Sequence, residues 1–185
     1  MRRAGPTGVA GSCLFGRPAG WWGARLSADG RYRYTLDRRW GPRPGAVVWI
    51  MLNPSTADAG GDDPTIRRCV GFTRGFGYDA LRVVNLFALR TTDPGVLRGA
   101  VDPVGPDNDR WLACVSRPAG RGPVVAAWGA HRLAAARAAR LLGAGVLPRR
   151  GLTCLGQTAA GQPRHPLYLP AGRQPRPWPG TPDTE

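Results

Sequence analysis

The feature that most constrains this chain is a continuous apolar run over residues 46–52, which ends abruptly at Asn53-Pro54-Ser55-Thr56. A run of β-branched and aromatic residues without polar alternation indicates a strand that is buried on both faces. Such strands belong to parallel sheets that are covered by helices on both sides. The polar residues after the run therefore mark the carboxyl end of a sheet strand, where open α/β sheets bind their ligands.

Strand-like and helix-like segments alternate along the rest of the chain. Further buried strands are expected at 81–86, 124–128 and 152–155, and the alternating segment 31–36 is expected to be an edge strand. Helices are expected from Pro64 to about Gly75, over 106–115 and over 131–142, with a short helical turn at Asp93-Pro94. The predicted fold is α/β, a three-layer sandwich with a mostly parallel central sheet.

The two ends of the sequence lack this pattern. Residues 1–20 are rich in Gly, Pro and Ala, and residues 171–185 are rich in proline with little apolar content. We therefore expect an N-terminal tail over 1–20, a single α/β domain over 21–170 and a disordered C-terminal tail over 171–185.

The chain is strongly basic. It has 26 basic residues, all of them arginine, against 12 acidic residues, which gives a formal net charge of +14. This charge attracts phosphate, so the expected partner is nucleic acid, DNA rather than RNA, or a nucleotide. A GC-rich coding sequence also produces a chain without lysine that is crowded with Ala, Gly and Pro, so the charge alone does not establish a partner.

Residue types that the sequence lacks exclude several mechanisms. Without lysine there is neither a Schiff-base residue nor a P-loop, and because Glu185 is the one glutamate, a catalytic carboxylate must be an aspartate. Widely spaced cysteines argue against a zinc finger and give no support for an iron–sulfur cluster; they are Cys13, Cys69, Cys114 and Cys154. We expect no metal, no cofactor, no membrane or signal segment, and a monomeric cytoplasmic protein with reduced thiols.

Polar residues near the ends of the predicted strands suggest a site. Asn53 follows the strand 46–52, Asn85 interrupts the strand 81–86, and His165-Pro166 follows the last predicted strand. Each also has a structural explanation, since Asn53 can end a strand, Asn85 can be a structural amide and His165 can be a loop residue.

Other polar and aromatic residues have structural explanations too. His131 and Asp62-Asp63-Pro64 are typical of helix starts. Solvated helix faces are expected for the arginines at helical spacing, which are Arg67, Arg68, Arg132, Arg137 and Arg140. Trp21 and Trp22 are expected either to cover a sheet edge or to stack on a ligand.

Seven segments together resemble the bacterial family known as domain of unknown function 1643, which has no settled activity. They are Arg39-Trp40-Gly41, Ile50-Met51-Leu52-Asn53-Pro54-Ser55-Thr56-Ala57-Asp58, Asp63-Pro64-Thr65-Ile66-Arg67-Arg68-Cys69, Val84-Asn85-Leu86-Phe87-Ala88-Leu89, Asp102-Pro103-Val104-Gly105-Pro106, Ala127-Trp128-Gly129 and His165-Pro166-Leu167-Tyr168-Leu169. The resemblance covers about residues 30–170.

A more distant similarity links the chain to the uracil-DNA glycosylase superfamily, whose α/β sandwich has a parallel central sheet. Those enzymes carry, in order, an Asp/Asn-Pro loop, a strand-end asparagine, a Leu-Trp-Gly strand end and a His-Pro loop. The corresponding elements here are Asn53-Pro54, Asn85, Trp128-Gly129 and His165-Pro166. The similarity implies a uracil-DNA-glycosylase-like fold.

The similarity also implies roles for particular residues. Asn53 would orient a water molecule beneath the sugar, His165 would donate to the departing base, and Asn85 would read the base edge. Substrate contacts are expected from the neighbouring residues Pro54, Ser55, Trp128, Pro166, Leu167 and Tyr168, with Leu167 or Tyr168 as the wedge that flips a base out of a duplex. The alternative carboxylates are Asp58, Asp62 and Asp63.

Three positions depart from the glycosylase pattern. Met51 replaces a glycine, Ser55 replaces the tyrosine that excludes thymine, and no serine follows His165-Pro166. The sequence therefore predicts a protein that acts on a nucleobase, as a metal-independent N-glycosidic bond hydrolase without strict uracil specificity. The alternatives are a non-enzymatic binder of nucleic acid or of a modified base, and a hydrolase of free nucleosides or nucleotides.

Overall fold

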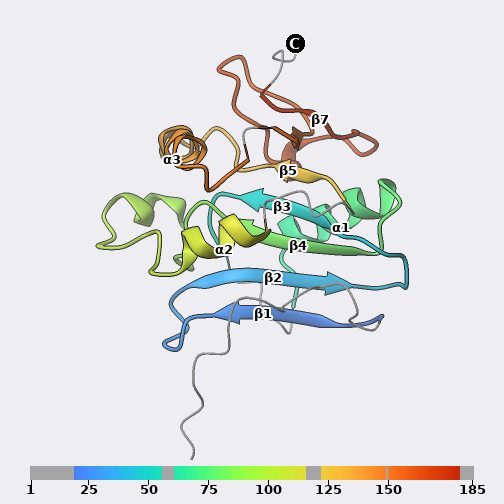
Figure 1. Cartoon of the computed structure of the whole chain (residues 1–185), viewed down its shortest axis with the longest axis horizontal. Coiled ribbons are helices and arrows are strands. Elements are labelled where there is room, and N and C mark those ends of the chain that lie inside the picture. Colours follow the sequence, from blue (N-terminus) through green and yellow to red (C-terminus); the bar gives the residue numbers. More distant parts are fainter. Residues whose placement is uncertain (1–18, 56–60, 116–121, 149, 180–185) are drawn as a thin grey trace, which may run out of the picture.

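A computed structural model describes residues 19–55, 61–115, 122–148 and 150–179. In this part of the chain seven strands form one sheet in the order β1-β2-β4-β3-β5-β6-β7 (Figure 1). The strands are β1 (Trp22–Leu26), β2 (Arg33–Arg39), β3 (Val47–Met51), β4 (Ala80–Asn85), β5 (Val124–Ala126), β6 (Leu152–Cys154) and β7 (Arg176–Pro177). The helices are α1 (Pro64–Gly75), α2 (Asn108–Val115) and α3 (Arg132–Gly143), with 3₁₀ turns η1 (Pro94–Arg98) and η2 (Pro166–Tyr168).

The sheet is mixed, with a parallel centre and antiparallel edges. Strands β4, β3, β5 and β6 are parallel, whereas β1, β2 and β7 pair antiparallel with their neighbours. The prediction of a mostly parallel sheet therefore holds for the central strands alone. After β3 the chain crosses to β4 on one side and later to β5 on the other, so the strand order reverses at β3. Such a reversal opens a crevice at the carboxyl ends of the strands.

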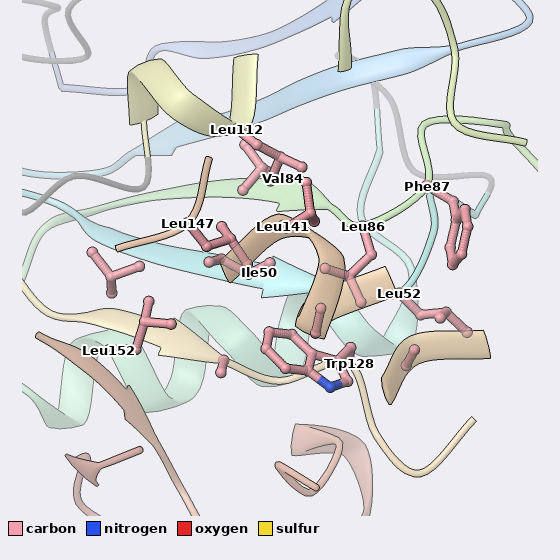
Figure 2. Packing of buried hydrophobic residues seen from close by; sticks show 14 of the residues in the cluster. Ile50, Leu52, Val84, Leu86, Phe87, Leu112, Trp128, Leu141, Leu147 and Leu152 are labelled. Carbon is pink, nitrogen blue, oxygen red and sulfur yellow. The ribbon is translucent and has the colours of Figure 1, made fainter. Parts of the chain in front are cut away.

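Helices cover both faces of the sheet, which confirms the α/β class. On one face Trp49 of β3 packs with Ile66 and Phe72 of α1. On the other, Ile50 packs with Leu112 of α2 and Leu141 of α3 (Figure 2). Successive residues of β3 thus point into opposite layers, as its unbroken apolar sequence predicts. Among the described residues, no helix has the length and apolar character needed to span a membrane.

The prediction that 31–36 is an edge strand is wrong. The segment contributes to β2, which lies between β1 and β4 and is buried along its whole length. Its polar residues have partners that a local pattern does not reveal. Asp37 pairs with Arg82 directly across the sheet, and Arg38 pairs with Asp62 at 2.8 Å while its guanidinium lies 4.4 Å from the ring centroid of Trp22.

The predicted start of the C-terminal tail, at residue 171, is also wrong, because the folded part of the chain continues beyond it. Residues 176–177 form β7, which pairs with β6, and Trp178 is buried. The Trp178 ring meets Trp128 edge-on at 4.9 Å, and its Nε1 donates to the Gly161 carbonyl. A single tryptophan anchors this proline-rich segment, which explains why its low apolar content misled the prediction. Residues 180–185 and the predicted N-terminal tail up to residue 18 lie outside the described residues.

The thiols of the described residues are free, with Cys69 and Cys154 buried and Cys114 exposed. Burial raises the pKa of the Cys69 thiol, so it stays protonated and unreactive. The fourth cysteine, Cys13, lies outside the described residues.

The buried pair between β2 and β4 yields a stability prediction. Asp37→Asn leaves the Arg82 guanidinium buried without its carboxylate, so we expect the free energy of unfolding to fall by about 3–5 kcal/mol. The double variant Asp37→Leu/Arg82→Met removes both charges and should recover most of that loss. Urea denaturation of the three proteins measures both effects. A single variant that loses less than about 1 kcal/mol would contradict the role of the pair.

Candidate functional site

A pocket of about 620 Å³ lies where the central strands end. Met51 and Leu52 line it from the end of β3, Asn85 from the end of β4, and Trp128 from just after β5. This is the crevice at which the strand order reverses. The pocket is completed by the start of α1 and by Arg164, His165, Leu167 and Tyr168.

The structure brings most of the predicted site residues together. The ones that line the pocket are Asn53, Ser55, Asp63, Asn85, Trp128, His165, Leu167 and Tyr168. Pro54, Pro166 and Asp62 are not part of the lining, and Asp58 lies outside the described residues. Trp21 and Trp22 are also absent from the pocket wall: Trp21 packs on Ala46 and Ala80, which fits the sheet-covering alternative.

Asn85 is the most unusual residue of the pocket. Its side chain is 1 % exposed, yet neither Nδ2 nor Oδ1 has a hydrogen-bond partner in the protein. Leaving a buried polar group unpaired costs about 1–3 kcal/mol, so a purely structural amide here would be expected to find partners. Asn85 is among the residues that line the pocket, so an amide with an unused donor and an unused acceptor lies in the pocket wall.

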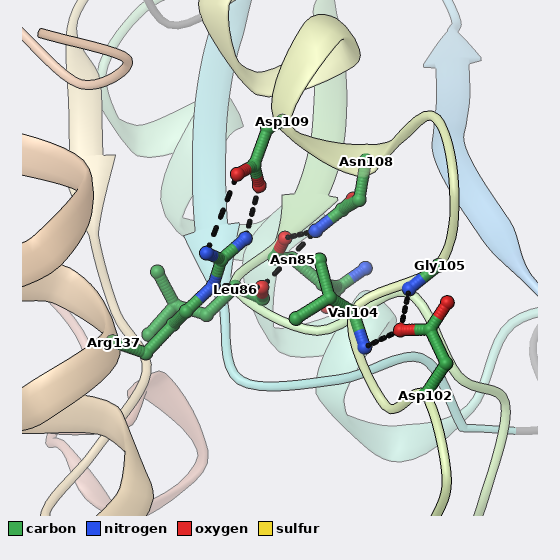
Figure 3. Close-up of polar contacts among 8 residues, drawn as sticks. All are labelled: Asn85, Leu86, Asp102, Val104, Gly105, Asn108, Asp109 and Arg137. Atoms are coloured by element: carbon green, nitrogen blue, oxygen red, sulfur yellow. Dashed lines mark hydrogen bonds and ion pairs between the residues drawn. The ribbon is translucent and has the colours of Figure 1, made fainter. Parts of the chain in front are cut away.

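The backbone beneath Asn85 is held by the helices on the other side (Figure 3). Asn108 of α2 donates from Nδ2 to the carbonyls of Asn85 and Leu86, both at 3.0 Å. Arg137 of α3 donates from Nε to the Leu86 carbonyl and pairs with Asp109 of α2. Arg137 is therefore buried, and the prediction that it lies on a solvated helix face is wrong because its partners come from a distant helix.

Asn53 follows β3 with its amide orientation fixed. Its Nδ2 donates to the Thr91 carbonyl at 2.8 Å and to the Pro54 carbonyl at 3.1 Å. With Nδ2 occupied by two acceptors, Oδ1 is the side-chain atom left to accept a hydrogen bond from a molecule in the pocket.

His165 presents a defined tautomer. It caps η2 by accepting the Leu167 backbone N–H on Nδ1 at 3.3 Å, so in the neutral ring the proton is on Nε2. Burial lowers the pKa of His165 from its ordinary value of 6.5, and the Asp63 carboxylate opposes this by raising it. The imidazole is therefore neutral at pH 7 and offers an Nε2–H donor.

Two neighbours hold the His165 segment against the pocket. Gly129 has a φ of +74°, and a Cβ there would lie 3.4 Å from the His165 Cβ, so glycine suits both the conformation and the close approach. Arg68 of α1 donates to the carbonyls of Pro166 and Leu169. Arg68 thus links η2 to α1. The prediction that Arg68 lies on a solvated helix face is therefore wrong.

The carboxylates near the pocket have structural partners. Asp63 is the N-cap of α1, as predicted, and its Oδ1 accepts the Ile66 N–H at 2.8 Å. Asp62 pairs with Arg38. Asp63 is thus the one acidic side chain among the described residues of the pocket wall.

Sequence reasoning missed several residues of the wall. They are Arg33, Thr91, Thr92, His131 and Arg164, among others. Arg33 starts β2 and is 2 % exposed, so it brings a buried guanidinium to the pocket. His131 caps α3 through Nδ1, as predicted, and also reaches the wall. With all basic residues of the chain being arginine, nothing in the sequence distinguished Arg33 or Arg164 from the rest.

Basic residues and helix N-termini outnumber acidic residues among the described residues of the pocket wall. The N-terminal ends of α1 and α3, each 12 residues long, reach it and carry the positive ends of their helix dipoles. Arg33 and Arg164 also line the pocket, where Asp63 is the one acidic residue of the part of the wall that the structure describes. The described residues contain no group of three or more His, Cys, Asp or Glu side chains that would hold a metal ion.

Comparison with protein families matches most of the chain to a known family. The family model described as "Protein of unknown function (DUF1643)" matches residues 33–167. No curated protein and no solved structure matches the chain.

The unpaired amide yields a stability prediction with a built-in control. Asn85→Leu removes two unsatisfied buried atoms and extends into the pocket, so we expect the free energy of unfolding to rise by about 1 kcal/mol. Asn108→Leu makes the same chemical change, but it strips two carbonyls of their donor and should lower the free energy of unfolding by about 2–3 kcal/mol. Thermal and urea unfolding compare the two. Equal losses in both variants would mean that Asn85 is a structural amide.

His165 yields a pH prediction. The unfolded chain takes up a proton near pH 6.5, whereas the folded chain does so only at lower pH. Stability relative to His165→Asn should therefore be constant above about pH 6.5 and should fall as the pH drops from there to the lowered pKa of the folded state, below which it no longer changes. Urea midpoints of both proteins between about pH 5 and 8 measure this. A difference that grows on acidification would show that the folded state favours the cation.

Proposed function

Since the chain belongs to the DUF1643 family of proteins of unknown function, we propose a function from the pocket itself: it binds a nucleobase and hydrolyses its N-glycosidic bond without a metal. The observation that carries this proposal is the Asn85 side chain, buried in the wall with donor and acceptor both unpaired. Base edges present alternating donors and acceptors, which a side-chain amide complements. A pocket of about 620 Å³ is in the size range of small-molecule sites.

In this proposal, a hydrogen-bond donor on His165 and the dipoles of two helices assist the departure of the base. When the bond between the base nitrogen and C1′ breaks, the electron pair leaves with the base and negative charge develops on its oxygen. The Nε2–H of neutral His165 would donate to that oxygen, and the helix N-termini would stabilise the charge.

Attack on the sugar is assigned to a water that Asn53 holds. With Nδ2 fixed on two carbonyls, Oδ1 would accept from a water beneath C1′. The water oxygen bonds to C1′, and the proton it releases ends on the departing base. The Asp63 carboxylate would stabilise the positive charge of the sugar from the wall.

A non-enzymatic base binder is the second candidate. It is favoured by one observation, that the single carboxylate of the described wall already caps a helix. In that case Asn85 would still read the base, and the nucleobase pocket would have no hydrolytic water.

A cleavage assay tests the proposal. The substrates are labelled single- and double-stranded oligonucleotides that carry uracil, hypoxanthine, xanthine, hydroxymethyluracil or mismatched thymine, and alkali reveals abasic sites. We expect abasic sites from the wild type on at least one base, and a rate lower by about a hundredfold or more in Asn53→Ala and His165→Ala, since each loses a group that acts in the transition state.

The second histidine of the chain provides the comparison. His131→Asn keeps a side-chain acceptor for the start of α3, so we expect it to lower the rate far less than His165→Ala. Abasic sites formed equally by all variants would rule out these roles. No cleavage of any substrate, together with base-dependent binding that Asn85→Leu abolishes, would establish the binder instead.

A further inference from the structure

A second hollow, of about 520 Å³, adjoins the pocket. The two share Ser55, Thr91 and Thr92 as lining residues, so they lie on either side of this strip of wall. The second hollow is otherwise lined by Arg31, Arg90, Gly30 and Leu89. We call it the Arg31–Arg90 groove.

Its two arginines come from segments far apart in sequence that pair with each other. The Arg90 backbone N–H donates to the Arg31 carbonyl at 3.0 Å, and the adjacent residues Tyr32 and Leu89 form an antiparallel bridge. Two guanidinium side chains are thereby brought to one groove, and no acidic residue is among the described residues that line it.

Neither guanidinium is paired with a carboxylate in the described part of the chain, where the ion pairs engage Arg38, Arg82 and Arg137. Arg31 is exposed and lies 5.6 Å from the ring centroid of Tyr32. Arg90 donates from Nη1 to the Gly30 carbonyl, and its Nε is buried without a hydrogen-bond partner.

The nearest acid in sequence is engaged in its own turn. Asp29 accepts hydrogen bonds from the Ser27 hydroxyl and from the Arg31 backbone N–H. The side chains of Arg31 and Arg90 therefore present positive charge and N–H donors to the groove, an arrangement that matches a phosphate group.

We propose that the Arg31–Arg90 groove binds a phosphate of the nucleotide whose base occupies the pocket, so that the substrate is a nucleotide or a strand rather than a free base or nucleoside. This inference rests on the proposed function, since it takes the pocket to hold a base. In a nucleotide only the sugar separates base from phosphate, and here only the strip of Ser55, Thr91 and Thr92 separates the two hollows. The hydroxyl groups of this strip lie where the sugar would cross.

The test compares ligands that differ by a phosphate. Binding is measured by calorimetry with deoxyuridine and deoxyinosine, with their 5′-monophosphates, with single-stranded oligonucleotides that contain either base, and with the same oligonucleotide carrying a tetrahydrofuran abasic site. We expect phosphate to strengthen binding by about tenfold. Arg31→Gln and Arg90→Gln should each remove most of that gain, and each should lower the slope of affinity against salt by about one.

Arg140→Gln is the matched control, because it removes the same charge from an exposed residue at the opposite end of α3 from the pocket. The Arg31 side chain is exposed and stacks on Tyr32, whereas the hydrogen bonds of Arg31 to Asp29 and Arg90 use its backbone, which Arg31→Gln leaves in place. This variant therefore remains informative if Arg90→Gln disturbs the turn at Gly30. A gain with monophosphates identifies a free nucleotide as the source of the phosphate. A gain confined to oligonucleotides identifies the strand, and both support the groove.

Other outcomes separate this inference from the proposed function. Base-dependent binding that Asn85→Leu abolishes, with no gain from phosphate, would overturn the groove and leave the proposed function standing. An abasic oligonucleotide that binds through Arg31 and Arg90, with no contribution from any base, would support the groove and overturn the base pocket. Variants at Arg31 and Arg90 that behave like Arg140→Gln would overturn the groove outright.

Discussion

The site depends on how the carbonyl end of β4 is held. Where a central strand ends, its last carbonyls lose their sheet partners and need donors from elsewhere. Asn108 supplies one donor group to both Asn85 and Leu86, and Arg137 supplies another to Leu86 (Figure 3). The pair between Arg137 and Asp109 joins the two donors' helices, so α2 and α3 are fixed to the strand end together. The backbone carbonyl of Asn85 thus receives its hydrogen bond from α2, while the Asn85 side chain belongs to the pocket wall.

This arrangement also aligns the neighbouring strand ends. Beyond the last ladder positions, the Leu86 N–H donates to the Met51 carbonyl and the Phe87 N–H to the Leu52 carbonyl. The chain after β4 therefore stays in register with the chain after β3, and Asn53 and Asn85 remain on the same edge of the sheet. The unpaired amide of Asn85 lowers the stability of the folded protein. The hydrogen bonds that hold the ends of β3 and β4 keep the amide in place despite this cost, as a preorganised binding site requires.

The sequence predicted the features that depend on a local pattern of residues, namely the buried strands and the polar residues at their ends. The apolar runs at β3 and β4 identified buried strands, and the rule that ligands bind at the carboxyl ends of parallel strands placed Asn53 and Asn85 together in the pocket. The features that the sequence did not predict depend on contacts between residues that are far apart in the chain. Burial of β2 required Asp37 to meet Arg82, and the order of the C-terminal segment required Trp178 to meet Trp128. Such pairs leave no periodic signal in a single sequence.

If the proposed function holds, the protonation state of His165 decides which bases the protein could release. Burial lowers the pKa of His165, and its Nδ1 accepts a backbone N–H, so the neutral ring would stabilise a departing base by hydrogen bonding but would not protonate it as a strong acid. Such a donor is sufficient when the leaving base is itself a weakly basic anion, and insufficient when the base must be protonated to leave. The geometry of His165 therefore favours bases that carry an exocyclic oxygen next to the glycosidic nitrogen, as pyrimidines do. Under the proposed function, a base without such an oxygen would bind in the pocket without being cleaved from its sugar.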